Sequence, residues 1–248
     1  MKFEDTEVWG FEHALRGMRN PKESWEKSDT TIRMEQDQNR TFREVANIGK
    51  NDMKLAQSLI RAGSEHRKFM RQIFVSVDIT APLYWWKEFD TYKVGTVANS
   101  TSTMHKLAST PITIDCFEMD DYEDVDIEVN GMVYSNTDSW NTQIAECEYL
   151  RQKYNKVMEN KKHLEEIKEF EEAKKAQMMA KKYWKALIRK LPESWLQKRT
   201  VTMDYENLLA ICSKGQRRFH KLTEWSDSFI TWARELPYAQ QLIFIDEV

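Results

Sequence analysis

One stretch in the first half of the chain limits the possible folds more than any other. Residues 73–79, Ile-Phe-Val-Ser-Val-Asp-Ile, place an apolar residue at every second position. This alternation predicts a half-buried strand. Ala81-Pro82 then interrupts the pattern, and an aromatic segment follows over residues 83–89. Because proline fits the first turn of a helix, where no N–H is needed, we expect a helix to begin here.

The segments on either side of this strand carry polar residues at ends of predicted elements. Asn51-Asp52 is expected to cap a helix over residues 53–62, and Gly63 is expected to end it. His66 then begins the connection to the strand, a place where side chains reach into a cleft. Further on, residues 99–103 form the polar run Asn-Ser-Thr-Ser-Thr. Hydroxyl groups at that density either cap helices or bind a ligand.

Composition excludes several functional classes. The 248 residues are 41% hydrophobic and 31% charged, which suffices for one large core or two small ones. The net charge of −3 gives no electrostatic drive towards nucleic acid. No apolar run is long enough for a membrane span, and the charged N-terminus does not predict a signal peptide. Cys116, Cys147 and Cys212 lack zinc-ligand spacing, so we expect no metal site and a cytoplasmic location.

The remaining segments have simpler patterns. Residues 29–50 are polar and predict a loop with a short helix, whereas Asn130-Gly131 between alternating residues predicts a β-hairpin. The acidic residues before that hairpin are expected to form a solvated loop, with a cation site as the alternative. Residues 141–190 have apolar residues at spacings of three and four and predict paired long helices that break near Asn160. Residues 242–245 are expected to form an edge strand.

The order of these elements resembles that of the flavin-dependent thymidylate synthases, over residues 53–106 and 187–236. When the family's motifs are laid along this chain without gaps, the family's active-site histidine falls on His66, and its active-site serine falls on Ser102. Ala81-Pro82 and Leu191-Pro192 also match. Thr91-Tyr92-Lys93 stands where the family has Arg-His-Arg, Met104 replaces the arginine after the serine, and Asp204 replaces an asparagine. The chain therefore resembles a diverged member without an intact Arg-His-Arg motif.

The resemblance implies a fold class. We expect an α+β fold in which a central antiparallel sheet is flanked by long helices. Residues 1–248 would form a single domain. Residues 107–186, with the acidic hairpin and the long helices, would be an insertion into it.

The resemblance also implies a reaction and its residues. The family methylates dUMP to dTMP with methylenetetrahydrofolate and reduced FAD, uses NADPH to reduce the flavin, and places its sites between the subunits of a homotetramer. Here the implied catalytic residues are His66 and Ser102, and the implied substrate contacts are Ser100, Ser102, Arg217 and Arg218. The implied FAD contacts are Tyr92, Lys93, Asn99 and Asp204. The alternative is a flavin-free relative that binds a pyrimidine nucleotide or serves as a structural or interaction protein.

Overall fold

The computed structural model describes residues 1–36, 42–102, 107–120 and 122–247. The chain divides into two compact units. Unit 1 contains residues 1–80, 85–100 and 198–248, and unit 2 contains residues 81–84 and 101–197. The expected α+β class with a central antiparallel sheet is confirmed.

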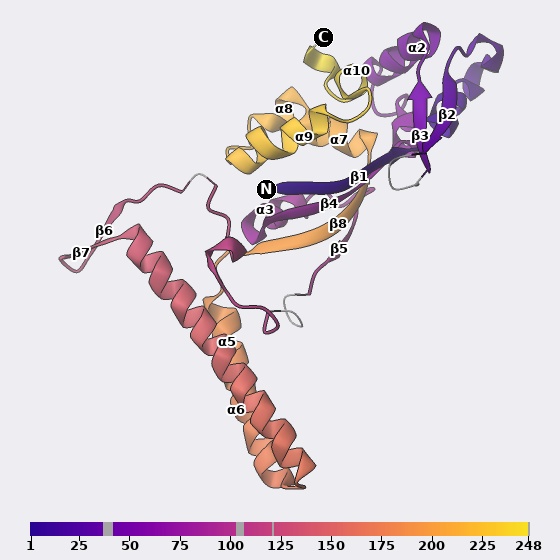
Figure 1. Cartoon of the computed structure of the whole chain (residues 1–248). Coiled ribbons are helices and arrows are strands. Elements are labelled where there is room, and N and C mark those ends of the chain that lie inside the picture. The colour runs from indigo at the N-terminus through magenta and orange to yellow at the C-terminus, as the bar shows by residue number, and fades with distance from the viewer. Residues whose placement is uncertain (37–41, 103–106, 121, 248) are drawn as a thin grey trace. The chain divides into compact units, whose positions relative to one another are not determined.

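A four-stranded sheet runs through unit 1, with the strand order β1-β4-β8-β5 (Figure 1). Both outer pairings, β1 with β4 and β5 with β8, are antiparallel. The predicted strand is confirmed as β4, in which alternate side chains at positions 75, 77 and 79 are buried. The strands are β1 (Lys2–Trp9), β4 (Phe74–Pro82), β5 (Val97–Ser100) and β8 (Leu196–Asp204).

Aromatic side chains fill the core of unit 1. The predicted helix after Pro82 is confirmed as α3 (Leu83–Phe89), and its Trp85, Trp86 and Phe89 are buried. Trp85 packs against Trp225 and Phe229, with ring centroids 4.7 and 5.8 Å away. Near the C-terminus, α7, α8 and α9 lie together on one side of the sheet (Figure 1). These later helices are α7 (Tyr205–Cys212), α8 (Lys214–Arg217), the π-helix η5 (Glu224–Phe229), α9 (Ile230–Arg234) and α10 (Ala239–Leu242).

Two sequence expectations for unit 1 are wrong. Residues 29–50 form a hairpin of β2 (Thr31–Gln36) and β3 (Phe42–Asn47), where a loop with a short helix was expected. Residues 242–245 do not form an edge strand: α10 ends at Leu242, residues 243 and 244 form a turn and a bend, and a 3-10 turn, η6 (Ile245–Glu247), follows. The side chains of residues 242–245 are buried, which accounts for their apolar character.

The helix before His66 begins earlier than its sequence predicts. It is α2 (Lys50–Arg61), so Asn51 and Asp52 lie inside the first turn and are not its cap. The carboxylate of Asp29 accepts hydrogen bonds from the backbone N–H groups of Asn51 and Asp52, at 2.9 and 3.0 Å. A side chain from a distant loop therefore satisfies the helix start. A Cβ atom at Gly49 would lie 2.1 Å from the Asp29 carboxyl carbon, so only glycine fits there.

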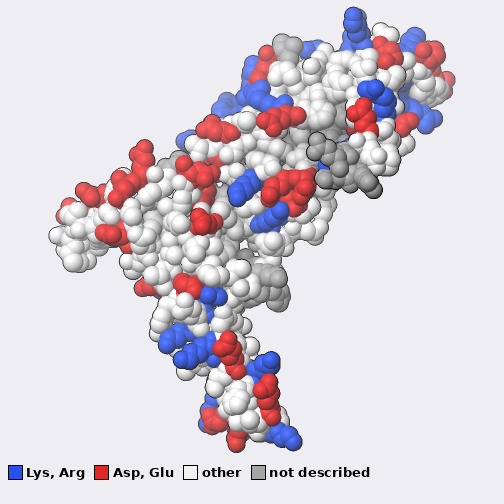
Figure 2. Space-filling view, in the orientation of Figure 1, with Lys and Arg blue, Asp and Glu red and all other residues white. Residues whose placement is uncertain are grey.

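Unit 2 consists of a hairpin and two long helices. Asn130-Gly131 forms the predicted turn, with positive φ at both residues, between β6 (Asp126–Val129) and β7 (Met132–Ser135). Asp and Glu side chains gather around this hairpin (Figure 2). Helices α5 (Asn136–Glu166) and α6 (Phe170–Lys190) pack along each other (Figure 1). The chain turns back at residues 167–169, where Lys168 has a φ of 64°, so the predicted break near Asn160 is wrong.

The core of unit 2 lies where these helices meet the loop before the hairpin. Its buried members are Leu107, Ile112, Phe117, Cys147 and Leu187. Tryptophan side chains at positions 140, 184 and 195 pack against this cluster. Within the described residues, no helix of either unit has the length and apolar character needed to cross a membrane.

Candidate functional site

A cavity of about 1340 Å³ lies in unit 1, beside the helix that leads to His66. Its walls come from the end of α1 (Phe11–Gly17), from α2, and from the 3-10 turns η1 (Asn20–Lys22), η2 (Trp25–Lys27) and η3 (Lys68–Gln72). His66 is exposed, lies in the turn between α2 and η3, and lines this cavity. The sequence prediction that His66 faces a cleft is consistent with this position.

One face of α2 forms a side of the cavity because helix residues three and four apart share a face. Lys54 and Ser58 present polar groups there, and Leu55 and Leu59 present apolar ones. The opposite face, with Asp52, Ala56 and Ile60, is buried in the unit. Together with the buried ring of Phe69, the two leucines give the cavity an apolar floor.

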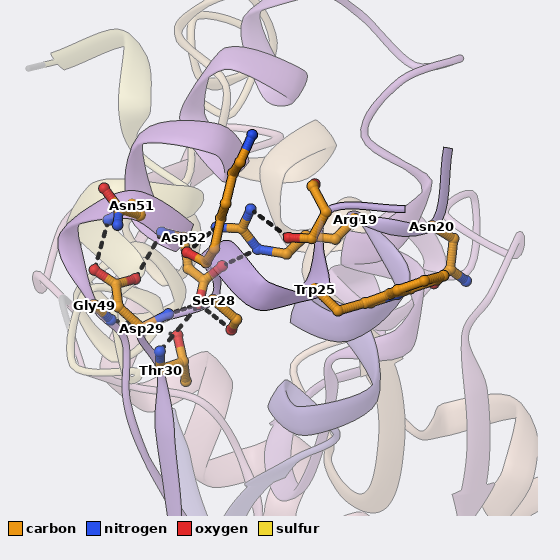
Figure 3. A network of polar contacts seen from close by, with 11 residues as sticks. Arg19, Asn20, Trp25, Ser28, Asp29, Thr30, Gly49, Asn51 and Asp52 are labelled. Atoms are coloured by element: carbon orange, nitrogen blue, oxygen red, sulfur yellow. Dashed lines mark hydrogen bonds and ion pairs between the residues drawn. The ribbon is translucent and has the colours of Figure 1, made fainter. Parts of the chain in front are cut away.

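A buried ion pair joins the loop of η1 and η2 to α2 (Figure 3). The Arg19 Nε donates to the Asp52 Oδ1 at 2.6 Å, and the two residues are 4% and 0% exposed. The other guanidinium nitrogens donate to the carbonyl oxygens of Ser24 and Lys27, at 3.3 and 3.1 Å. The guanidinium group therefore holds the loop of η1 and η2 in place beside the cavity.

The carboxylate of Asp52 is fully engaged on its second oxygen as well. The Ser28 hydroxyl and the backbone N–H groups of Asp29 and Thr30 donate to Oδ2, at 2.7, 3.2 and 3.1 Å. Burial raises the pKa of Asp52, but the hydrogen bonds from Thr30, Ser28 and Arg19 outweigh it and hold the pKa below its ordinary value. Asp52 is therefore a buried carboxylate that stays charged and keeps the wall together.

The cavity has far more cationic than anionic groups. Arg19, Lys22, Lys27, Lys54 and Lys68 line it, and Glu65 is the one acidic residue among the residues that line it. Arg19 is paired with Asp52, and Lys68 lies 3.6 Å from Glu65. Positive charge that converges on a partly apolar cavity suits an anionic ligand with a flat ring.

A second polar cluster contains Tyr92, one of the residues predicted to contact FAD. Its hydroxyl lies 2.8 Å from the Nε2 of His220 and accepts a hydrogen bond from the Gln216 amide at 2.8 Å. The His220 ring stacks on Trp225 at 4.3 Å between centroids. The His220 Nδ1 is buried and has no hydrogen-bond partner among the described residues.

Burial sets the protonation states in this cluster. Burial raises the pKa of Tyr92, and it lowers the pKa of His220 against the opposing effect of Glu88. The nearer Glu88 oxygen lies 3.5 Å from His220 Nε2, and the other accepts a hydrogen bond from the Trp225 indole at 3.0 Å. The cluster is thus a set of neutral, mutually bonded groups around one carboxylate.

Asp204, also predicted to contact FAD, is engaged within the chain. It caps α7 by accepting from the backbone N–H of Asn207 at 2.9 Å, and the Asn207 side chain bonds back to the Asp204 N–H at 3.2 Å. The Asn207 amide also donates to the carbonyl oxygen of Val94. Burial raises the pKa of Asp204. Gly95, with a φ of 77°, approaches so closely that its Cβ would lie 2.9 Å from the Asp204 carboxylate.

The other predicted residues are spread over the two units. Arg217 forms an ion pair with Glu247, and Arg218 lies over the ring of Phe219 at 4.6 Å. Lys93, Asn99 and Ser100 are exposed in unit 1. Ser102 is half-buried in a loop of unit 2. Within unit 1, the structure brings Tyr92 close to α8 and the Val94-Gly95 turn close to Asp204, whereas His66 lies on the separate cavity.

Comparison with known proteins identifies the fold. Two crystal structures of the flavin-dependent thymidylate synthase from Helicobacter pylori, each with FAD and dUMP, match this chain. One has a TM-score of 0.55 at 15% identity and covers 99% of both chains. The other has a TM-score of 0.57 at 14% identity and covers 99% of this chain and 98% of the other. The chain has the flavin-dependent thymidylate synthase fold. No protein-family model and no curated protein matches the sequence of this chain.

Several residues of these two sites were not found by sequence reasoning. The cavity lysines at positions 22, 27 and 54 were missed, and so were the Arg19–Asp52 pair and His220. Lys54 had a usable signal, because it lies on the polar face of a predicted amphipathic helix that leads to His66. The Arg19–Asp52 pair had none, since 33 positions separate the two residues in the sequence. Among the described residues, no group of three or more His, Cys, Asp or Glu side chains could hold a metal ion.

Proposed function

We propose that this protein binds a pyrimidine nucleotide, with dUMP as the first candidate, in the cavity that His66 lines. The observation that carries the proposal is the position of His66 on a large cavity with cationic walls and an apolar floor. The thymidylate synthase fold supports it, since the two structures compared here contain dUMP. A nucleotide needs cations for its phosphate and an apolar surface for its base. The cavity offers both.

The sharper form of the proposal is the full reaction, in which dUMP becomes dTMP with methylenetetrahydrofolate, FAD and NADPH. It would use His66 and Ser102 as catalytic residues and Ser100, Arg217 and Arg218 as further substrate contacts.

When bound, FAD would supply the hydride chemistry of this reaction. The residues predicted to hold FAD do not fit it as they stand. The Tyr92 hydroxyl bonds to His220 and Gln216, and the Asp204 carboxylate caps α7. Lys93 and Asn99 are then left to contact FAD.

These internal contacts of Tyr92 and Asp204 favour the second candidate, a flavin-free relative that binds the nucleotide or acts as an interaction protein.

In unit 2, large apolar side chains are exposed along the paired helices α5 and α6. They support assembly into a homo-oligomer, with a tetramer as the first candidate. These side chains are Tyr149, Phe170, Met178 and Met179 on the helices, with Ile167 in the turn between them. We place the protein in the cytoplasm, because its three cysteines are free thiols, as a reducing compartment favours.

Visible absorbance spectroscopy and calorimetry together test these proposals. We expect purified protein to show no flavin band, and titration with dUMP to release or absorb heat with a saturable profile. A flavin band that co-purifies, or a shift of the FAD absorption bands when FAD is mixed with the protein, would support the full reaction and overturn the flavin-free form. If dUMP does not bind in the presence or the absence of FAD, the nucleotide-binding proposal is overturned. The remaining candidate function would then be that of an interaction protein.

A matched pair of histidine variants locates the binding. His66→Ala should weaken dUMP binding, because His66 lines the cavity. His13→Ala is the control, since His13 is an exposed residue of α1 outside the cavity lining. Equal affinities for the two variants would show that dUMP binds elsewhere.

A further inference from the structure

The β6–β7 hairpin of unit 2 has two different faces, because successive side chains of a strand point to opposite sides. One face is apolar and holds Ile127, Val129, Met132 and Tyr134. Tyr134 lines a cavity of about 540 Å³ together with residues of α5 and α6, so this face turns towards the helices of its own unit. The opposite face holds Asp126, Glu128 and Val133, and all three are exposed. An acidic face with an apolar side chain on it therefore turns away from these helices.

Helix α6 carries a surface of matching shape and opposite charge, which we call the Met178 surface. The Met178 side chain is 61% exposed. Residues three and four positions away are its neighbours on the helix, and all four of them are exposed lysines. They are Lys174, Lys175, Lys181 and Lys182. Lys175 also pairs with Glu172 at 2.6 Å, but residues 173–190 contain basic residues and no acidic one. The Met178 surface thus has an apolar centre and a basic rim.

The hairpin does not reach the Met178 surface of its own copy. Ser135, the last residue of β7, caps α5, and the start of α5 lies beside the end of α6, where Gln143 donates to the carbonyl oxygen of Lys190 at 3.0 Å. At 1.5 Å per residue, Met178 lies roughly 30 Å from Ser135 along the paired helices. The strand β7 and its turn span less than roughly 20 Å, and the hairpin projects outwards from the start of α5 (Figure 1). A contact between the two surfaces therefore joins two copies of the chain.

We propose that two copies of this chain dock so that the acidic hairpin face of each lies on the Met178 surface of the other. Val133 of one copy packs on Met178 of the other, and Asp126 and Glu128 lie among the lysines. The two contacts are equivalent, as in a pair related by a two-fold axis. An apolar centre within a rim of complementary charges is the common organisation of a protein interface. This inference rests on the proposed homo-oligomer and names the surfaces that meet in it.

Sedimentation of the full chain at two salt concentrations is the first test. Charges on a surface are screened beyond about 10 Å at 0.1 M salt and beyond about 3 Å at 1 M. We therefore expect the dissociation constant of the oligomer to rise at least about ten-fold between these two concentrations. An equal dissociation constant at both would overturn this inference while the proposed homo-oligomer stands. A chain that is a monomer under all conditions would overturn both.

Charge-reversal variants then locate the contact. The helix variant carries Lys181→Glu and Lys182→Glu, and the hairpin variant carries Asp126→Lys and Glu128→Lys. Each variant has like charges on both of its surfaces, so each alone should associate at least about ten-fold more weakly than the wild type at 0.1 M salt. An equal mixture of the two variants has opposite charges in both contacts. We therefore expect the two variants to associate with each other as the wild type does with itself.

The matched control for the helix variant is Lys50→Glu with Lys221→Glu, which changes the net charge equally at exposed lysines of unit 1. This control should associate like the wild type, and thermal unfolding shows that each variant is folded. If both charge-reversal variants associate like the wild type, or if their folded mixture does not recover, the inference is overturned. Binding of the wild type but not of the helix variant to vesicles of anionic lipid, with the oligomeric state unchanged, would assign the lysines to a membrane surface and also overturn it.

Discussion

The two polar regions of unit 1 differ in how their charges are satisfied. Around Tyr92, the hydroxyl, imidazole and amide groups bond to one another, and the nearby Asp204 caps a helix. Beside His66, the inner pair of Arg19 and Asp52 is satisfied, whereas Lys22, Lys27 and Lys54 outside it have no acidic partner among the described residues. The resemblance to a family assigned a cofactor to the first region. The internal contacts favour a structural part for the first region, and we propose that the ligand binds in the second.

The largest expected effect comes from removing Asp52. Asp52→Ala leaves the Arg19 guanidinium buried without its counter-charge, and such a loss destabilises a protein by about 3–5 kcal/mol. Urea denaturation of the variant and the wild type measures this difference. Asp29→Ala is the comparison, because it removes only the hydrogen bonds at the start of α2 and should cost about 1 kcal/mol. Equal losses in the two variants would contradict the central role of the Arg19–Asp52 pair.

A smaller effect is expected at Tyr92. Tyr92→Phe removes the hydroxyl that bonds to His220 and Gln216, and a buried group left unpaired costs about 1–3 kcal/mol. The same variant should leave dUMP affinity unchanged, because its effect is structural. Denaturation and calorimetry on one preparation test both parts. Lower dUMP affinity without loss of stability would show that Tyr92 belongs to a ligand site.

The third prediction concerns pH and the same cluster. Because the pKa of His220 is lowered in the folded protein, the unfolded chain binds more protons as the pH falls through about 6.5. The stability from neutral His220 is therefore present above that pH and lost below it. Glu88, the charged group that faces the ring, opposes this shift, and the Tyr92 phenol stays neutral over this range.

Denaturation midpoints measured between about pH 5 and 8 should fall towards the acid end in the wild type, and His220→Asn should flatten the curve. Glu148, whose pKa is lowered to about 2 by the hydrogen bond from Arg151, loses its contribution only below its ordinary value of 4.5. A wild-type curve that is flat over this range would contradict the burial of a neutral His220.

The smallest effect on stability is expected at His66. Because the His66 side chain is exposed and forms no hydrogen bond or ion pair with another described residue, His66→Ala should change the free energy of unfolding by less than about 0.5 kcal/mol. Its dUMP affinity should nevertheless fall, as proposed above. Thermal unfolding measures the first quantity. A large loss of stability would mean that His66 is a structural residue.

Sequence patterns predicted the elements whose periodicity is local. The alternation over residues 73–79 predicted β4, Asn130-Gly131 predicted the hairpin of unit 2, and Pro82 predicted the start of α3. The sequence predictions were wrong where contacts with residues distant in the sequence determine the local structure. The cap of α2 comes from Asp29, and the turns at residues 242–245 are set by burial. The insertion over residues 107–186 stays a prediction.

The candidate site was predictable only in part. His66 was found through its place between a helix and a strand, which is a local signal. The lysines at positions 22, 27 and 54 converge only after the chain folds, and the partners of Tyr92 lie more than 120 positions away in the sequence. A resemblance assigns roles to positions, but it does not show whether their side chains are already bonded to each other.

A crystal structure of this protein with dUMP would show directly whether the nucleotide binds in the cavity beside His66. We expect phosphate oxygens within hydrogen-bond distance of the ammonium groups of the cavity lysines Lys22, Lys27 and Lys54, with the base against Leu55 and Leu59. Phosphates found instead beside Tyr92, Lys93 and Arg217, with the bond between Tyr92 and His220 broken, would contradict it.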